Sequence, residues 1–179
     1  MLKQRRNKGP APPLDREGLE RLAIAYVGRY ATTRAKLRAY LARKLNSRGW
    51  SGPGEPPFDD VVGRMAALGL VDDASFATAK AASMTRRGLG ERRVDAVLRA
   101  AGVAGEDSVE ARAAAADEAW AAAVRFAQRK KIGPYAIQIP DRAAQARQFA
   151  MMMRAGHRTD VARRVLGGEA LSFPEGDDL

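Results

Sequence analysis

The chain contains no cysteine and only one histidine, His157. Without cysteine there can be no disulfide, no thiolate metal ligand and no cysteine nucleophile, a composition compatible with a reducing cytoplasm. A single histidine beside a glycine has no second imidazole with which to share a metal ion, so we predict that His157 is a surface or capping residue. We therefore expect neither a metal ion nor another cofactor.

Motifs for phosphate and carboxylate chemistry are also missing. No glycine-rich turn ends in Lys-Ser or Lys-Thr, as a phosphate-binding loop does. The acidic pairs at 59–60, 72–73 and 117–118 each stand at the start of a helical pattern, where carboxylates complement free backbone N–H groups and the helix dipole. The sequence thus predicts a protein that is not an enzyme. A small hydrolase or nuclease remains an alternative, which a screen for divalent-metal activity would test.

Aromatic residues make up only 6% of the chain, whereas alanine supplies about a fifth. This balance favours helices and provides few large side chains for one extensive core. No stretch approaches the roughly 20 apolar residues of a membrane span, and the basic, proline-rich start lacks the apolar run of a secretory signal. We expect a cytoplasmic protein that does not enter a membrane.

Apolar residues recur with helical spacing along most of the chain. The first stripe consists of Leu19, Leu22, Ala23, Tyr26, Val27 and Tyr30. A second helix, capped by Thr32 or Thr33, places Leu37, Tyr40, Leu41 and Leu45 inward, and a third runs from Asp59 or Asp60 to Gly69. Because the three tyrosines share this spacing, we expect them in the core. The last helix should be capped by Thr159 or Asp160.

Three glycines set a period along the chain. Gly49, Gly102 and Gly156 are separated by 102 − 49 = 53 and 156 − 102 = 54 residues, and each follows a basic helix. A constant period of this size is typical of tandem modules. The sequence therefore predicts an all-α fold of three tandem three-helix repeats that form an elongated, curved molecule. The expected divisions are a basic, proline-rich, disordered segment 1–17, repeats 18–70, 71–116 and 117–168, and an acidic, flexible tail 169–179.

The formal charge is +10, and the sequence pI is about 10.5. Residues 21–54 contain eight lysines and arginines and no acidic residue, an arrangement that forgoes favourable ion pairs along a helix. Such a surface indicates an anionic partner, although the charges could also serve solubility alone. The candidate partner-binding residues are Arg34, Lys36, Arg43, Arg48, Arg86, Arg87, Arg92, Arg93, Arg147, Arg154, Arg163 and Arg164.

Three segments together resemble a known family. They are Gly69-Leu70-Val71-Asp72-Asp73-Ala74-Ser75-Phe76-Ala77, Arg87-Gly88-Leu89-Gly90-Glu91-Arg92-Arg93-Val94 and Leu98-Arg99-Ala100-Ala101-Gly102-Val103. This pattern is similar to the central signature of the RecX family, bacterial modulators of the RecA recombinase, and the likeness extends over about residues 19–167. Its Gly88-Leu89-Gly90 element lies between two helical patterns, so we predict a helix–helix turn there.

The resemblance implies a non-catalytic regulator in DNA repair and the SOS response. Family members bind RecA and its filament on single-stranded DNA and inhibit its recombinase, ATPase and co-protease activities. By this resemblance, Lys36 and Arg43, Arg92 and Arg93, and Arg147 and Arg154 are expected to contact the filament, one set per repeat of a monomeric protein. The sequence leaves open whether the protein also binds DNA weakly and directly.

The chain departs from the family pattern at several places. Lys36 stands where members often carry Glu, and segments 51–57 and 133–140 are longer or richer in proline than usual. The first repeat is therefore where partner preference would differ most. The alternative function is a direct nucleic-acid-binding helical protein, such as a helix-turn-helix regulator, which would bind naked duplex, usually as a dimer.

Overall fold

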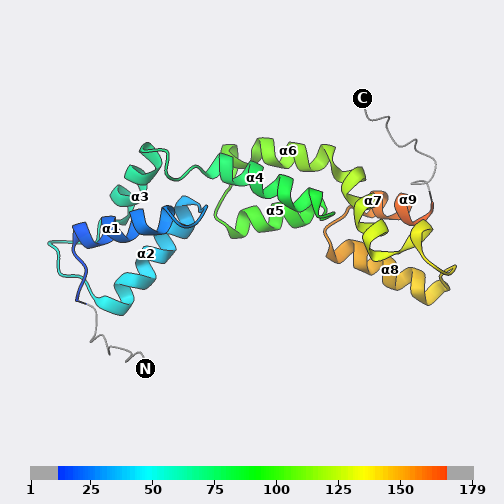
Figure 1. Cartoon of the computed structure of the whole chain (residues 1–179), viewed down its shortest axis with the longest axis horizontal. Coiled ribbons are helices and arrows are strands. Elements are labelled where there is room, and N and C mark those ends of the chain that lie inside the picture. Colours follow the sequence, from blue (N-terminus) through cyan, green and yellow to red (C-terminus); the bar gives the residue numbers. More distant parts are fainter. Residues whose placement is uncertain (1–11, 169–179) are drawn as a thin grey trace, which may run out of the picture. The chain divides into compact units, whose positions relative to one another are not determined.

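A computed structural model describes residues 12–168 of the chain, shown in Figure 1. Within this range the secondary structure is helical, and the only β-type pairing is an isolated bridge between Leu14 and Trp50. The predicted all-α class is confirmed for these residues. Residues 1–11 of the expected N-terminal segment, and all of the expected tail 169–179, lie outside the described residues.

The described residues form nine α-helices and two short 3-10 helices. The α-helices are α1 (Arg16–Val27), α2 (Arg34–Arg48), α3 (Phe58–Ala67), α4 (Asp73–Arg86), α5 (Glu91–Ala100), α6 (Val109–Asp117), α7 (Ala119–Lys130), α8 (Arg142–Arg154) and α9 (Thr159–Leu166). The 3-10 helices are η1 (Gly105–Ser108) and η2 (Gly133–Tyr135).

Contacts divide the chain into two compact units, Met1–Asp73 and Ala74–Leu179. In the first unit, α1, α2 and α3 all pack on one another around Leu19, Leu37, Leu41 and Met65, which are fully buried. The predicted cap of α2 is Thr33, whose hydroxyl accepts from the Lys36 N–H at 3.2 Å. Ahead of α1, Leu14 is buried and Asp15 caps the helix by accepting from the Gly18 N–H.

Asp73 is the first residue of α4, but its side chain caps the start of a different helix, α2. Its side chain is 6% exposed, and its carboxylate accepts from the backbone N–H of Arg34 at 2.9 Å, in the first turn of α2. Free N–H groups at a helix start need such a partner when they are removed from water. Asp73 therefore ties the end of the first unit to the start of α2, and this role explains a carboxylate here without any catalysis.

The second unit contains two hydrophobic clusters. One lies among α4, α5 and α6 and is built from small residues, including Ala77, Ala81, Ala111 and Ala115, around Leu98. The other lies among α7, α8 and α9 and contains larger side chains: Phe126, Ile132, Met152 and Val165. Leu89 packs against both clusters. The high alanine content thus serves close helix packing, since small side chains let helix backbones approach each other.

The glycines that set the sequence period all have a positive φ at a helix end. Gly49, Gly102 and Gly156 have φ values of +83°, +76° and +90°, and they follow α2, α5 and α8 respectively. L-residues with a side chain rarely adopt this region, which makes glycine the usual residue after a helix end. The ends at Gly102 and Gly156 are equivalent, since the next N–H donates to the carbonyl five residues before it, whereas Gly49 is itself the cap residue of α2.

The Gly88–Gly90 segment is a turn between α4 and α5, as the sequence predicts, and it packs directly on the turn between α8 and α9. The Gly90 N–H donates to the Ala155 carbonyl at 3.0 Å, and the Arg92 N–H donates to the Gly156 carbonyl at 3.1 Å. A Cβ at Gly156 would lie 2.4 Å from the Arg93 nitrogen, and a Cβ at Gly90 would lie 2.3 Å from the Gly156 oxygen. Only glycine at both positions permits this backbone contact.

The prediction that His157 is a surface or capping residue is wrong. Its side chain is 2% exposed and meets the ring of Phe126 edge-on, with 5.3 Å between ring centroids. Burial lowers the pKa of His157 to about 4, while a hydrogen bond to the Gly88 backbone opposes that shift. The residue is buried because the turn that carries it folds beneath the Gly88–Gly90 turn, a long-range contact that local sequence does not reveal.

Three local predictions also need correction. Tyr30 is 57% exposed, because α1 ends at Val27 and the helical stripe does not continue to residue 30. The cap position of α9 is occupied by Arg158, with Thr159 as the first helical residue. Helix α3 begins at Phe58, so Asp59 and Asp60 lie in its first turn rather than ahead of it.

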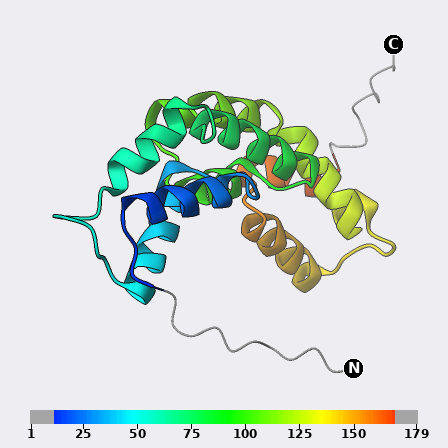
Figure 2. The same cartoon turned by 60° about the vertical axis from the view of Figure 1, so that its left-hand side comes forward.

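The segments 51–57 and 133–140 belong to connections between helices, one in each unit. The segment 51–57 joins α2 to α3, and the segment between α7 and α8 includes η2. In Figure 2 both extend away from the helices that they join. Ile137 and Ile139, the only short strand-like alternation in the sequence, are 84% and 98% exposed and are not part of a strand.

Replacing Gly156 tests the backbone contact between the two turns. Gly156→Ala should lower the free energy of unfolding by at least about 3 kcal/mol, because it combines an unfavourable φ with a steric clash. The matched variant Gly105→Ala has a similar positive φ (+59°) but nothing within 4 Å of the new Cβ, and should cost only about 1 kcal/mol. Urea unfolding followed by circular dichroism measures both, and equal losses would contradict the close contact.

The pH dependence of stability tests the burial of His157. Its pKa is about 4 in the folded protein and near 6.5 in the unfolded chain, so the unfolded chain takes up the proton first as the pH falls. The stabilisation is complete above pH 6.5 and is lost between pH 6.5 and 4, by about 2–3 kcal/mol.

Because the chain has one histidine, its imidazole gives a single set of proton resonances whose titration reports the pKa directly. In His157→Leu the fall in stability between pH 6.5 and 5 should disappear, although the variant differs in absolute stability. A midpoint near 6.5 in the folded protein would show that the ring is not buried as described.

Candidate partner interface

Four of the predicted contact residues lie on α2, but they do not share one face. Leu37 and Leu41 turn into the core, while Lys36 and Arg43 stand seven residues apart, two helical turns, on one exposed side. Arg34 is exposed beside the α2–α3 groove. Arg48 is half-buried and donates to the Pro12 carbonyl at 2.9 Å. The structure thus brings Lys36 and Arg43 together and separates Arg34 and Arg48 from them.

In the second unit, the contact between the two turns gathers basic residues that are far apart in the sequence. Arg92 and Arg93 are exposed in the first turn of α5, which bonds to Gly156, and Arg154 is the last residue of α8. Arg147 lies two turns earlier on α8, on the same side as Arg154. Arg92, Arg93 and Arg154 therefore lie beside the contact between the two turns, and Arg147 lies two helical turns away from it along α8.

Arg86 and Arg87 lie at the other end of the Gly88–Gly90 turn. Both side chains are exposed at the end of α4. The Arg87 carbonyl accepts a hydrogen bond from the Arg129 guanidinium, which also lies 5.8 Å from the Phe126 ring centroid. The turn is therefore flanked by basic side chains on both sides.

Arg163 and Arg164 point to different neighbours of α9. The Arg163 guanidinium lies 5.9 Å from the Phe149 ring centroid on α8, and that of Arg164 lies 4.9 Å from the Trp120 ring centroid on α7. Contacts of a cation with an aromatic ring stabilise such positions even at a protein surface. These two arginines thus have roles in packing α9 as well as a place on its exposed side.

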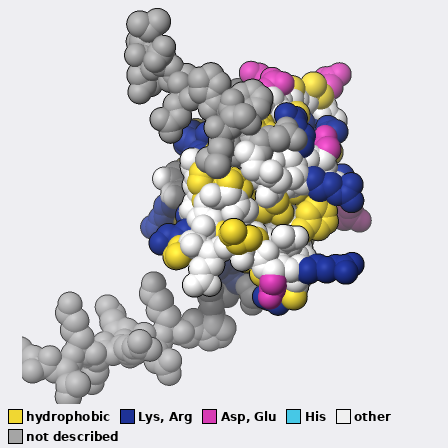
Figure 3. Space-filling model, turned by 90° about the vertical axis from the view of Figure 1, so that its right-hand side faces the viewer, with side chains coloured by type: hydrophobic (Ala, Val, Ile, Leu, Met, Phe, Trp, Pro, Cys, Tyr) yellow, Lys and Arg dark blue, Asp and Glu magenta, His cyan; other side chains and the backbone are white. Residues whose placement is uncertain are grey.

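Some of the arginines form salt bridges with carboxylates of the chain, and others do not. Acidic residues pair with Arg16, Arg21, Arg38, Arg64, Arg99, Arg112, Arg125 and Arg158. Within residues 12–168 no salt bridge is formed by ten of the predicted contact residues: Arg34, Arg43, Arg48, Arg86, Arg87, Arg92, Arg93, Arg147, Arg154 and Arg163. The positive charge of this set is therefore not neutralised by the described part of the chain. Figure 3 shows Lys and Arg side chains around the margin of one face, with hydrophobic side chains between them.

Sequence reasoning missed two basic residues beside these turns. Arg129 reaches the Arg87 carbonyl, and Arg158 lies 3.1 Å from Asp160 and 3.9 Å from Glu91. Arg129 begins the short basic run Arg129-Lys130-Lys131 and Arg158 has no lysine or arginine beside it, but in neither case does the local sequence show that the side chain reaches the start of α5 or the α4–α5 turn. The contact with Glu91 joins the start of α5 to the α8–α9 turn, and this link supports the close approach of Gly90 and Gly156.

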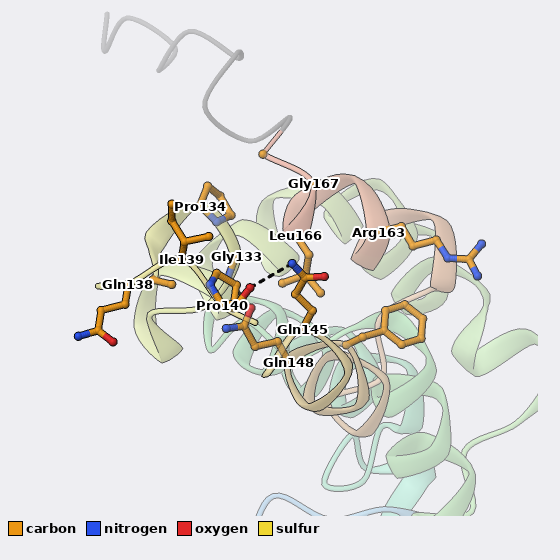
Figure 4. Close-up of a pocket in the computed structure, with 13 residues that line it drawn as sticks. Gly133, Pro134, Gln138, Ile139, Pro140, Gln145, Gln148, Arg163, Leu166 and Gly167 are labelled. Carbon is orange, nitrogen blue, oxygen red and sulfur yellow. Dashed lines mark hydrogen bonds between the residues drawn. The ribbon is translucent and has the colours of Figure 1, made fainter. Parts of the chain in front are cut away.

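A hollow of about 600 Å³ lies beside the connection between α7 and α8. Gln145 donates to the Pro140 carbonyl at 3.1 Å, and the Gly133 N–H donates to Gln148 at 2.9 Å (Figure 4). The labelled glutamines and prolines of the figure come from this connection and from α8. Its lining residues include no carboxylate, imidazole or thiol, so this hollow has no group for acid–base or nucleophilic chemistry.

The described residues also bear on metal binding and membrane insertion. No group of three or more His, Cys, Asp or Glu side chains is placed to hold a metal ion within residues 12–168. In the same part of the chain, every helix is too short or too polar to span a bilayer.

The amino-acid sequence is similar to those of several known proteins. No family model matches the chain. The chain is 34% identical over 163 residues to Regulatory protein RecX of Mycobacterium ulcerans, covering 89% of this chain and 91% of that protein. It is 28% identical over 173 residues to Regulatory protein RecX of Myxococcus xanthus (91% and 92% covered), and 34% identical over 154 residues to that of Thermus thermophilus (86% and 85% covered).

The fold is similar to a solved structure. The crystal structure of RecX from Lactobacillus salivarius matches with a TM-score of 0.63 over 88% of this chain and 97% of that chain, at 15% sequence identity. At this identity the likeness establishes the fold, and the sequence relatives establish the family that the signature residues predict. From the two together, the chain belongs to the RecX family.

Proposed function

We propose that this protein is a non-catalytic regulator that binds the RecA recombinase and its filament on single-stranded DNA, and thereby inhibits recombinase, ATPase and co-protease activity. The observation that carries the proposal is the set of arginines, among the predicted contact residues, that form no salt bridge within residues 12–168, in a chain of the RecX family. Such an arginine can bind an acidic protein surface or a phosphate without first breaking a salt bridge in this part of the chain.

The proposed contacts are Lys36 and Arg43 on α2, Arg92 and Arg93 on α5, and Arg147 and Arg154 on α8. Each pair lies on the second helix of a group of three, which supports one contact set per repeat. The repeats are those of the sequence analysis, 18–70, 71–116 and 117–168, and each contains one of the three hydrophobic clusters in large part. The remaining predicted residues flank these pairs and would add weaker, salt-screened attraction.

The proposal describes a cytoplasmic monomer that acts by occupancy alone. A bound regulator that blocks filament growth lowers the activity of many RecA subunits at once. Binding itself therefore causes the inhibition, and the regulator need not catalyse a reaction. Function in DNA repair and the SOS response would follow from control of RecA.

The first experiment measures single-stranded-DNA-dependent ATP hydrolysis by RecA of the same organism while this protein is titrated in. Inhibition at protein amounts well below the amount of RecA is expected, because one regulator at a filament end or groove affects many subunits. An unchanged ATPase rate in the presence of folded protein at equimolar amounts would refute the proposed function.

Charge reversal tests the contact residues. Arg92→Glu with Arg93→Glu should raise the concentration for half-inhibition at least about tenfold, as should Lys36→Glu with Arg43→Glu, because each removes two attractive charges and adds two repulsive ones.

The matched control is Lys80→Glu with Arg142→Glu, which makes the same change of net charge at exposed positions on α4 and α8 outside the proposed set. It should inhibit like the wild type. Equal weakening by all three double variants would mean that net charge, rather than these residues, determines binding; circular dichroism confirms that each variant is folded.

A further inference from the structure

A pocket lined by tyrosines lies between α1 and α2 in the first unit. Its lining residues are Leu22, Ala25, Tyr26, Arg29, Tyr30 and Tyr40, and its volume is about 470 Å³. Leu22, Ala25 and Tyr26 line it from α1, at i, i+3 and i+4, and Arg29 and Tyr30 line it from the segment that follows this helix. Tyr40 completes it from α2.

The three tyrosines form a connected set of rings, of which one is open to solvent. Tyr26 and Tyr40 are stacked, with centroids 4.1 Å apart and planes at 17°. Tyr30 lies 5.2 Å from Tyr26 at 47° and is 57% exposed. Tyr26 and Tyr40 also pack against the hydrophobic core of the unit. The first two rings are therefore fixed in place, and they support a third ring that presents a large aromatic surface to solvent.

The surroundings of this pocket are basic. Arg29 belongs to the lining, and the Lys44 ammonium lies 5.6 Å from the Tyr40 ring centroid. Lys36, Tyr40, Arg43 and Lys44 follow one another at i, i+4, i+7 and i+8 on α2, so they share one side of that helix. The pocket lies within residues 21–54, which contain no acidic residue.

An exposed aromatic ring beside several cations fits a ligand that carries both flat rings and negative charge. Nucleic-acid strands are bound in this way: bases stack on aromatic side chains, and lysines and arginines follow the phosphates. An acidic peptide would match the charge, but it carries no regular series of flat rings for the stacked tyrosines.

We propose that the pocket of Tyr26, Tyr30 and Tyr40 binds a base of single-stranded DNA, with Tyr30 as the stacking surface and Arg29 and Lys44 directed at the neighbouring phosphates. This site goes beyond the proposed regulation of RecA, since it requires no RecA for binding. It also assigns a role to an exposed tyrosine that helical spacing alone places in the core.

The test uses the full chain and two fluorescein-labelled strands in the absence of RecA. One strand is oligo(dT), and the other has the same length and phosphates but abasic sugars. Fluorescence anisotropy should show tighter binding of oligo(dT). Tyr30→Ala should weaken oligo(dT) binding about tenfold, within the range found for loss of one stacked base, and leave the abasic strand unaffected. Tyr30→Phe, which keeps the ring, should retain the wild-type affinity.

The matched control is Ile24→Ala, because Ile24 is also an exposed apolar residue (54%) of the same region but does not line the pocket. It should bind both strands like the wild type. Since Tyr30 and Ile24 are exposed, neither change should unfold the protein. Equal affinity for the two strands, or equal loss in Tyr30→Ala and Ile24→Ala, would overturn the proposal.

Lys44→Gln tests the phosphate contact. Both strands should bind more weakly, and the slope of log K against log salt concentration should become shallower by about 0.7, the value for one phosphate contact to a single strand. If a labelled peptide of alternating Glu and Tyr instead binds in a Tyr30-dependent manner while oligo(dT) does not, the pocket is a protein-docking site and the DNA assignment is wrong. RecA inhibition is measured separately, so failure of either proposal leaves the other intact.

Discussion

The second unit depends on a backbone contact that only glycine allows. Gly90 and Gly156 bring the α4–α5 turn and the α8–α9 turn so close that the N–H groups of Gly90 and Arg92 bond to the carbonyls of Ala155 and Gly156. This contact buries His157 against Phe126 and joins the two hydrophobic clusters through Leu89. It also sets the distance between α5 and the end of α8, and therefore the spacing of the basic side chains that these helices carry. In this unit the same backbone contact therefore determines both the packing of the helices and the position of the candidate interface residues.

The signature segments of the sequence contain residues with internal structural roles, and exposed arginines lie near them. Asp73, Gly88 and Gly90, which carry the likeness to the RecX family, are occupied by internal bonds and close packing. The exposed arginines near them have no such internal role, apart from those that pair with acidic residues or aromatic rings. A family signature can therefore specify how helices are joined while the side chains that meet a partner vary around it. Lys36 fits this view, because the buried side chains of Leu37 and Leu41 hold α2 in the core whatever charge residue 36 bears.

Much of the fold could be predicted from the sequence because its signals are local. Helical spacing, the Thr33 cap and the period of Gly49, Gly102 and Gly156 each depend on residues within one helix or at its end. The burial of His157 could not be predicted, since it results from a turn about 70 residues earlier in the chain, at Gly88 to Gly90. The exposure of Tyr30 was missed for a smaller reason: α1 ends three residues before it, and helix ends are the least certain feature of a spacing pattern. A charge run identifies a basic segment, such as Arg129 to Lys131, but it does not show which side chain meets a distant turn through tertiary packing, as Arg129 and Arg158 do.

The acid-free stretch of the first unit also explains why its candidate sites lie where they do. Helix α2 contains no acidic residue, so it forms no i,i+4 ion pair of its own and depends on Leu37, Leu41 and the Asp73 bond to Arg34 for its stability. Those contacts all lie on its inner side or at its start. Its other cations have contacts as well, since Arg38 pairs with Asp59, Lys44 lies 5.6 Å from the Tyr40 ring centroid and Arg48 donates to the Pro12 carbonyl. The mutual repulsion of these cations weakens when an anion binds beside them. A strand of DNA and an acidic protein surface would both relieve this repulsion, but only the strand also offers bases to the ring of Tyr30. In the proposed DNA site, charge would account for attraction to this unit, and the tyrosines would distinguish a nucleic-acid strand from other anions.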